Sequence, residues 1–460
     1  MGQSEERKAQ RFMGRLDVDS LRAAAQAGEI DTVVLAAVDM QGRLMGKRLS
    51  VDYFLDHVLE HHAEGCNYLL TTDIEMTPVQ GYAHASWATG YGDFVFVPDL
   101  STLRRIPWLE GTALVLCDLH WEDGSPVAVS PRQILRRQVN RLAERGLVGL
   151  AGTELEFLVF RNTYEEAWQL GYRNLTPATR YNVDYALLDS GNLEPLMRAI
   201  RNAMQGAGFE VEYSKGECNR GQHEVNFRYK PVLEMADLHA IYKNGAKEIA
   251  ARHGCSLTFM AKFDEREGNS CHIHFSVRST RGDPVMADGD QLSELGRQFV
   301  AGLLRYTPEL MVFFAPNINS YKRYAASSFA PTALVWGRDN RTCAIRVVGH
   351  GRSLRLEHRV PGGDVNPYLA LAAIIAAGLR GMDEKLQLEP PFNGNAYQSS
   401  APRVPMTLRD ACDRLAQSSM AVEAFGKEVV EHYVHMARTE VAAFDAAVTD
   451  WERVRCFERM

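Results

Sequence analysis

Short runs of β-branched and apolar residues dominate the first quarter of the chain. The runs DTVVLAAVD, DFVFVPD and TALVLCD are separated by glycine, aspartate and proline. The segment VDMQGRLMGKRLS has apolar positions on both sides of a polar centre, which is typical of a β-hairpin. This pattern predicts a small strand-rich domain over residues 1–120.

The pattern changes after residue 120. Pro131 stands at a predicted helix start, and apolar residues follow it at helical spacing. Strands such as LAGTELEFLVF, HEVNFRY and SCHIHFSVR then alternate with apolar-periodic helices, including one over about 366–381 and others within 407–445. We therefore expect a second, larger domain over residues 121–460 that mixes helices and strands.

Composition and charge narrow the class of protein. With 46% apolar and 24% charged residues, the chain is an ordinary globular one. A net charge of −7 argues against a nucleic-acid or membrane-surface partner, because both bind concentrated positive charge. The eight cysteines contain no C-x-x-C pair, and the segment MGQSEERKAQ at the start is polar and charged rather than apolar, so we expect a cytoplasmic protein without a targeting signal.

One strand segment carries two carboxylates on the same face. Glu154 and Glu156 in LAGTELEFLVF are two positions apart, and alternate residues of a strand share a face. An isolated pair of this kind is usually a solvated strand face, but the apolar residues Leu155, Phe157 and Leu158 crowd this segment. A divalent cation is the common way to balance two carboxylates held away from water.

Three further segments contribute similar groups. ECNRGQHE places Glu217 and Glu224 around a glycine turn, and GNSCHIHFS puts His272 and His274 on one face of a strand. The segment RLEHRVPGG adds Glu357. Carboxylates with one or two imidazoles select Mg²⁺ or Mn²⁺ over zinc, and such ions commonly serve phosphate chemistry.

Arginines follow in the same part of the chain. Between positions 323 and 359 lie Arg323, Arg341, Arg346, Arg355 and Arg359. Guanidinium groups recognise carboxylate and phosphate through paired hydrogen bonds. Taken alone, these residues are equally compatible with structural or surface roles.

In chain order, these segments resemble the glutamine synthetase superfamily, type I-like. The resemblance runs through GYGDFVFVPDL, AGTELEF, ECNRGQHE, GNSCHIH, NSYKR, DNRTCAIR and LRLEHRVPGGDVNPYLA. It implies an α+β fold, in which an N-terminal β-grasp-like domain precedes a large catalytic domain with a curved antiparallel sheet and helices. The sequence has no Walker A loop, so a P-loop phosphotransferase is not indicated.

The resemblance also implies two sets of metal ligands. One divalent ion, Mg²⁺ or Mn²⁺, would be held by three carboxylates: Glu156, Glu217 and Glu224. A second ion, which faces the phosphates of ATP, would be held by Glu154, His272 and Glu357.

Roles for ATP and glutamate are implied in the same way. The nucleotide positions are His274, Ser276, Arg346 and Arg355, with Tyr229 near the adenine. Gly268 and Arg323 match positions that seat glutamate, with Arg323 pairing its α-carboxylate. Arg341 and Arg359 match those that hold the transferred phosphoryl group and the γ-carboxylate.

The implied reaction has two steps. The γ-carboxylate of glutamate attacks ATP to give γ-glutamyl phosphate, and an amine then displaces phosphate. Members of the family commonly form dodecamers of two hexameric rings, with active sites between subunits. We therefore expect a homo-oligomer of this kind, in which Asp93 of the small domain completes a neighbouring site.

Two segments depart from the members that use ammonia. Phe329 stands where those enzymes have a catalytic flap glutamate, and TTDIEMTPVQGY replaces a D-G-S-S turn, leaving Asp73 or Glu75 as a substitute acid. A phenyl ring cannot take a proton from ammonium, but it suits the methylenes and the cation of a larger amine. The leading interpretation is a ligase similar to the γ-glutamylpolyamine and γ-glutamylethanolamide synthetase branch, with a polyamine or a small monoamine such as ethanolamine as substrate.

Two alternatives stay open from the sequence. One is a true glutamine synthetase that uses ammonium. The other is a catalytically silent relative that serves as a nitrogen sensor or scaffold, although a silent protein has no chemical need for the six ligand residues.

Overall fold

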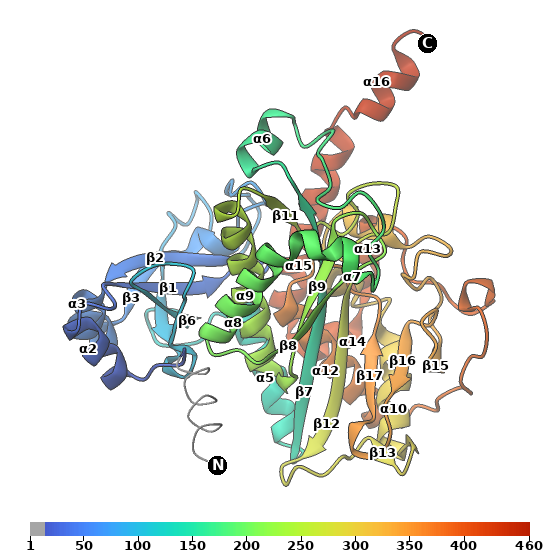
Figure 1. Cartoon of the computed structure of the whole chain (residues 1–460). Coiled ribbons are helices and arrows are strands. Elements are labelled where there is room, and N and C mark those ends of the chain that lie inside the picture. The colour runs from blue at the N-terminus through green and yellow to red at the C-terminus, as the bar shows by residue number, and fades with distance from the viewer. Residues whose placement is uncertain (1–13) are drawn as a thin grey trace.

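The structure of this chain is a computed structural model that describes residues 14–460 and contains two main sheets (Figure 1). Residues 1–13 lie outside the described part. The start of the predicted domain 1–120 and the charged N-terminal segment therefore lie outside it as well.

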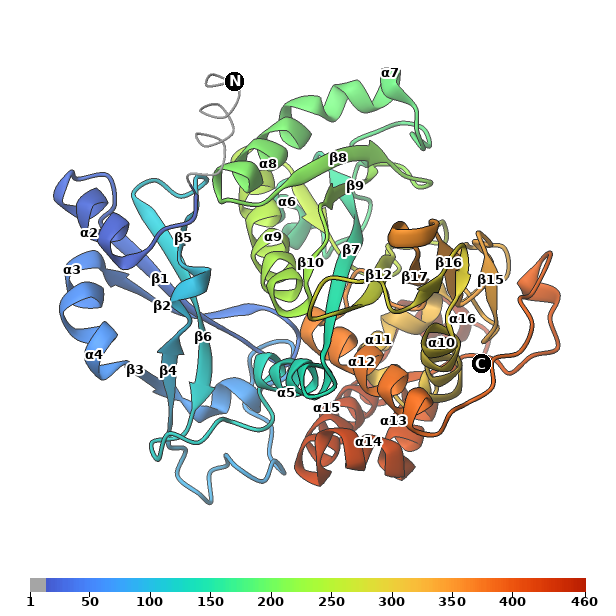
Figure 2. The ribbon, with the colours of Figure 1, turned by 90° about the horizontal axis from the view of Figure 1, so that it is seen from below.

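The smaller sheet belongs to the N-terminal part of the chain. Its strands are β1 (Thr32–Val38), β2 (Leu44–Ser50), β3 (Ala63–Cys66), β4 (Asp93–Pro98), β5 (Arg104–Arg105) and β6 (Thr112–His120). The order is β2-β1-β6-β4-β3, with β5 on β6. β1 and β2 form the hairpin that the sequence predicts, whereas β1 pairs with β6 in parallel. Helices α2 (Val18–Gln26), α3 (Val51–Tyr53) and α4 (Leu59–His61) lie beside this sheet (Figure 2).

The larger sheet is built around β7 (Leu147–Phe160). β7 pairs with β12 (Cys271–Ser279) on one side and with β9 (Gln222–Phe227) on the other, both antiparallel. The remaining strands are β8 (Val211–Gly216), β10 (Lys230–Pro231), β11 (Ser256–Thr258), β15 (Trp336–Arg338), β16 (Ile345–Val348) and β17 (Arg355–His358). The pairings of this sheet are antiparallel as expected, except that β15 and β16 are parallel. A separate small ribbon joins β13 (Ala287–Asp288) to β14 (Gln291–Leu292).

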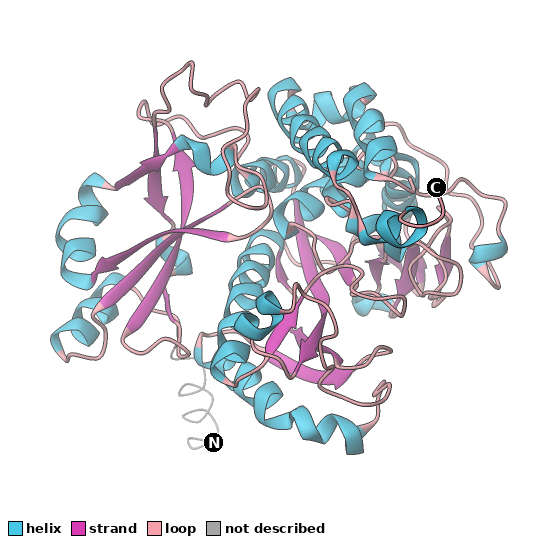
Figure 3. Cartoon of the chain, turned by 90° about the horizontal axis from the view of Figure 1, so that it is seen from above, coloured by secondary structure: helices cyan, strands magenta, loops and turns pink. Residues whose placement is uncertain are grey.

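Helices gather beside the larger sheet (Figure 3). The long ones are α5 (Pro131–Ala143), α8 (Glu194–Gly206), α9 (Val232–Arg252), α10 (Glu294–Tyr306), α12 (Pro367–Asp383), α13 (Leu408–Gln417) and α15 (Lys427–Ala446). The short ones are α6 (Tyr164–Gln169), α7 (Leu187–Ser190), α11 (Met311–Phe314), α14 (Ser419–Phe425) and α16 (Asp450–Cys456). Between residues 14 and 460, no helix combines the length and apolar character needed to cross a membrane.

The central helix α12 depends on a close approach by its neighbour. It is apolar on almost all sides and buried along most of its length. A Cβ on Gly302 of α10 would come within 2.2 Å of the carbonyl oxygen of Ala377. Glycine at this position therefore lets α10 and α12 pack backbone to backbone.

A buried arginine joins the two parts of the molecule. Arg132 of α5 is 1% exposed and donates hydrogen bonds to Asp118 of β6 and to Asp99, each at 2.7 Å. It also donates two bonds to Asp237 of α9, at 3.0 and 2.9 Å. The hydroxyl of Tyr368 in α12 donates to the same Asp237 at 2.7 Å. The small sheet and three helices of the large part are thus held by one guanidinium group.

Replacing this arginine should destabilise the protein strongly. Arg132→Met leaves the buried Asp237 without its cation, although Asp118 keeps its bond to Arg136, so we expect the free energy of unfolding to fall by about 3–5 kcal/mol in urea titration. Arg145→Met is the matched control, because its pair with Asp383 is partly exposed and should contribute less than about 1 kcal/mol. Similar losses in the two variants would show that the Arg132 network does not hold the domains together.

Candidate active site

Strand register brings the chemistry-bearing segments together. Glu154 lies opposite His272, and Glu156 lies opposite Glu224. On the far side of β12, Glu357 of β17 lies opposite His274. Directly opposed residues of antiparallel strands project on the same side of the sheet, so these groups converge on one face.

All six predicted metal ligands line one cavity of about 420 Å³, which we call the carboxylate cavity. Ligand atoms of Glu154, Glu156 and His272 lie within 4.8 Å of one another, and so do those of Glu156, Glu217 and Glu224. The same-face arrangement predicted for Glu154 and Glu156 is therefore confirmed. Nδ1 of His272 is 2.9 Å from Glu154 Oε1 and 3.6 Å from Glu357 Oε1. The structure thus brings the six residues together, while their role as ligands stays a prediction.

One side of the cavity holds carboxylates that lack a counter-charge. Burial and the neighbouring Glu217 raise the pKa of Glu156 to about 8, and burial together with Glu154 raises that of Glu224 to about 10. Within residues 14–460, Glu224 Oε2 and His272 Nε2 are buried without a hydrogen-bond partner. Unpaired carboxylate oxygens beside a neutral imidazole nitrogen fit a Mg²⁺ or Mn²⁺ ion.

On the other side of the cavity, two arginines neutralise the charge of Glu357. Arg346 donates to Glu357 Oε2 at 2.8 Å, and Arg359 forms an ion pair with Glu357 Oε1. Although burial opposes it, the charge of Arg359 lowers the pKa of Glu357 to about 2. Glu156 and Glu224, whose pKa values are raised, thus face a carboxylate that arginines hold in its ionised form.

The predicted glutamate-binding residues separate into two groups. Gly268, Phe329, Arg341 and Arg359 line the cavity. Arg323 does not, because its buried guanidinium donates to the Val360 carbonyl at 3.0 Å and to Ser270 Oγ at 2.8 Å. Arg323 thus lies behind the wall and supports Ser270, which lines the cavity, while its pairing with a substrate carboxylate stays a prediction.

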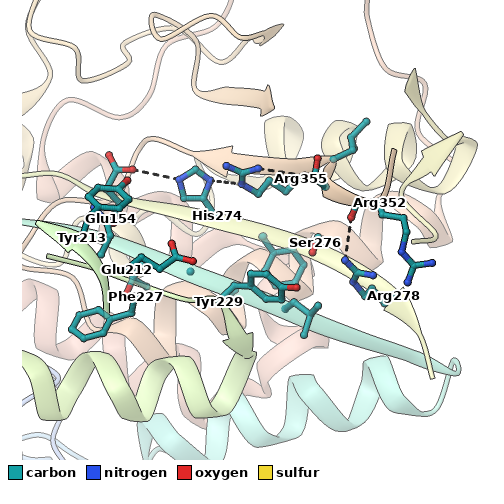
Figure 4. Close-up of a pocket in the computed structure, with 18 residues that line it drawn as sticks. Glu154, Glu212, Tyr213, Phe227, Tyr229, His274, Ser276, Arg278, Arg352 and Arg355 are labelled. Carbon is teal, nitrogen blue, oxygen red and sulfur yellow. Dashed lines mark hydrogen bonds and ion pairs between the residues drawn. The ribbon is translucent and has the colours of Figure 1, made fainter. Parts of the chain in front are cut away.

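A second cavity, of about 600 Å³, adjoins the first (Figure 4). It is lined by four of the predicted nucleotide residues: Tyr229, His274, Ser276 and Arg355. His274 Nε2 is 3.4 Å from Glu154 Oε2, and Arg355 Nε donates to His274 Nδ1 at 3.2 Å. Glu154, His274 and Arg355 line both cavities and form their shared border. Arg346, also predicted to contact the nucleotide, lines the carboxylate cavity instead.

The sequence did not predict three residues that line the carboxylate cavity, Lys215, Asp184 and Tyr185. Lys215 forms an ion pair with Glu217, lies 3.3 Å from Asp184 Oδ1 and places its ammonium group 4.2 Å from the ring centroid of Tyr185. Lys215 precedes Glu217 by two positions, and that spacing could have indicated a shared face. Asp184 and Tyr185 belong to no regular helix or strand, so their sequence context gave no signal.

Asp93 is separate from this constellation. It is exposed at the start of β4 and lines neither cavity of its own chain. Its role in a neighbouring subunit stays a prediction.

The chain is similar to known proteins over most of its length. The family model described as glutamine synthetase, catalytic domain, matches residues 128–456. A Streptomyces coelicolor protein named gamma-glutamylethanolamide synthetase GlnA4 is 60% identical over 97% of this chain and 96% of its own length. Glutamate–isopropylamine ligase from a Pseudomonas species is 36% identical over 98% of this chain and 99% of its own. A solved structure of GmaS with ADP has a TM-score of 0.83 at 26% identity, covering 95% of this chain and 99% of that one.

Metal binding should release protons. The raised pKa values of Glu156 and Glu224 mean that both carboxyls carry protons at neutral pH, and a bound cation must displace them. We expect calorimetric titration with Mg²⁺, in buffers of different ionisation enthalpy, to show a net release of about one to two protons per chain.

Glu224→Gln should weaken Mg²⁺ binding about tenfold or more and lower the proton release by about one. The matched control is Glu265→Gln, which changes an exposed glutamate outside both cavities. Equal affinity and proton release in Glu224→Gln and the unmodified protein would contradict the assignment of Glu224 as a ligand.

Proposed function

The chain belongs to the glutamine synthetase family, and we propose that it is an ATP-dependent ligase that joins the γ-carboxylate of L-glutamate to a small amine such as ethanolamine. The reaction would pass through γ-glutamyl phosphate. The product would be a γ-glutamyl amide.

Two adjoining cavities support the first step of this reaction. ATP in the cavity lined by Tyr229 and Ser276 would direct its phosphates to the border formed by Glu154, His274 and Arg355. Mg²⁺ or Mn²⁺, when bound, neutralises negative charge on phosphate oxygens.

The arginines of the carboxylate cavity supply the remaining positive charge. Arg341 and Arg359 line it and would hold the γ-carboxylate and the transferred phosphoryl group in line. Guanidinium charge of this kind stabilises a phosphoryl-transfer transition state because it is already in place before charge develops.

Phe329 is the observation that carries the choice of amine. It lines the carboxylate cavity, is half-exposed and has a left-handed backbone conformation with φ of 57°. Its carbonyl accepts a hydrogen bond from Arg359 Nη2 at 3.4 Å. A bulky residue in this conformation is unusual and marks functional loops. The apolar ring favours an amine that carries methylene groups over ammonium.

Asp184 is a candidate for removing the proton of the incoming amine. It lines the same cavity, at hydrogen-bond distance from Lys215 and from Cys218 Sγ. A carboxylate at this position would attract an alkylammonium ion and accept its proton before attack on the acyl phosphate. The 60% identity to gamma-glutamylethanolamide synthetase GlnA4 supports ethanolamine within this class of amines.

A homo-oligomer in the cytoplasm completes the proposal. Asp93 lines neither cavity of its own chain, so a neighbouring subunit would be needed to bring such a residue to the site. The family resemblance favours two hexameric rings. The eight cysteines are all unpaired, which agrees with a reducing compartment.

An amine panel tests the proposed reaction directly. Phosphate release with glutamate, ATP and Mg²⁺ should be fastest with ethanolamine, compared with isopropylamine, methylamine, putrescine and ammonium. Ammonium alone should give about a tenth of that kcat/KM or less. Equal turnover with ammonium would favour a glutamine synthetase, and tight ADP binding without turnover on any amine would favour a silent scaffold.

Introducing an acid at position 329 should shift the selectivity between amines toward ammonium. In Phe329→Glu we expect the ratio of kcat/KM for ammonium to that for ethanolamine to rise about tenfold, because the carboxylate attracts ammonium and the apolar contact is lost. Phe329→Leu is the control, since it keeps an apolar side chain without adding charge. An unchanged ratio in Phe329→Glu would show that this position does not select the amine.

A further inference from the structure

A larger cavity, of about 790 Å³, lies between the two parts of the molecule. The small part contributes the turn between β1 and β2 at residues 40–45, together with Ile74 and Met76. The large part contributes α9, the segment 316–319, Asp364 and the end of α15. None of its lining residues lines the two cavities of the candidate active site. Its volume lies in the range of small-molecule sites.

Most of the cavity wall is apolar and adaptable. Five methionines line it: Met40, Met45, Met76, Met260 and Met436. Phe259 adds an aromatic surface. Flexible thioether side chains can adjust to an apolar ligand of irregular shape.

Two lysines give the cavity a local positive charge. Lys243 and Lys247 are one turn apart on α9, and their ammonium groups lie 5.6 and 5.9 Å from the ring centroid of Phe259. Lys243 donates to two backbone carbonyls, those of Gly363 at 2.9 Å and Val365 at 3.5 Å. Within residues 14–460, neither lysine forms an ion pair with a carboxylate.

The other charged groups of the cavity form no ion pair with these two lysines within residues 14–460. Arg43 is paired with Asp39 at 2.6 Å. Asp364 offsets part of the charge on Lys243; its Oδ2 accepts from Asn317 at 2.8 Å and from Ser320 at 2.6 Å, and its buried Oδ1 has no hydrogen-bond partner within residues 14–460. Glu440 also lines the cavity, and burial, followed by the repulsion of Asp73 and Glu75, raises its pKa.

The pKa values of the lysines agree with an uncompensated charge. Burial and the repulsion of Lys247 lower the pKa of Lys243 to about 8. Burial and Arg43 lower the pKa of Lys247. An anion between the two ammonium groups would relieve this repulsion.

We propose that this cavity binds a small organic anion with an apolar body. Its anionic group would lie between Lys243 and Lys247, and its hydrocarbon part would contact Phe259 and the methionines. The class includes aliphatic and aromatic carboxylates, sulfonates and phosphate esters, which share this chemistry.

The backbone around Gly363 lies between this cavity and the carboxylate cavity. Lys243 donates a hydrogen bond to the carbonyl oxygen of Gly363, which lies in the loop that follows Glu357 and Arg359. A Cβ on Gly363 would come within 2.8 Å of the Phe259 carbonyl oxygen and 3.2 Å of the Glu156 carbonyl oxygen. A ligand here would therefore contact both parts of the molecule and the loop behind the active site.

The probe for the test is 8-anilinonaphthalene-1-sulfonate, whose fluorescence rises in an apolar site. We expect one saturable site per chain, unchanged by saturating ADP and Mg²⁺. The double variant Lys243→Met with Lys247→Met should lower the affinity about tenfold or more. Lys247→Met alone should lower it less and serves as the variant with the smaller structural change, because Lys247 makes no backbone hydrogen bond.

Two controls separate this site from general apolar binding. Lys427→Met removes an exposed lysine of α15 that pairs with Glu431 and should leave the affinity unchanged. The uncharged analogue N-phenyl-1-naphthylamine should bind the unmodified protein about tenfold more weakly than the sulfonate. Thermal unfolding of each variant confirms that it is folded. Unchanged sulfonate affinity in the folded Lys247→Met and double variants, equal binding of the neutral analogue, or displacement by ADP would overturn the proposal.

Discussion

Repulsion among buried carboxylates is the constraint on which the rest of this molecule depends. Glu154, Glu156, Glu217 and Glu224 converge in one cavity, where an unpaired charge costs several kcal/mol. The structure meets this constraint differently on the two sides. Arginines and histidines keep Glu154 and Glu357 ionised, whereas Glu156 and Glu224 have raised pKa values that only an added cation would lower.

That asymmetry explains why the two cavities adjoin at Glu154. Under the proposed function, a nucleotide phosphate approaching from the side of Arg355 would meet His274 and Glu154 at the border. Phosphoryl transfer requires that negative charge be neutralised where two anions meet. The cavity carries arginines on one wall and, on the other, a carboxylate cluster that suits a divalent cation.

The same reliance on paired charge holds the two parts of the chain together. Arg132 satisfies three aspartates from both parts, so the small sheet has a fixed position against α5 and α9. The methionine-lined cavity lies on the same boundary, between the β1–β2 turn and α9. There, within residues 14–460, Lys243 and Lys247 form no ion pair with an acid, which contrasts with the fully paired Arg132.

The sequence by itself determined the strands, the helices, the family and the shared faces of Glu154 with Glu156, because alternation along a strand is a local property with a period of two. It also identified the four segments that carry the predicted metal ligands, as well as Phe329. Tertiary structure decided that Glu154 meets His272 and that Glu156 meets Glu224, since strand register depends on contacts between distant segments. It placed Arg323 behind the wall and Arg346 on Glu357, and it brought Asp184 and the pair Lys243 and Lys247 to cavity surfaces. No local pattern reports which side of a wall a long side chain occupies, because that choice is made by packing against residues far away in the chain.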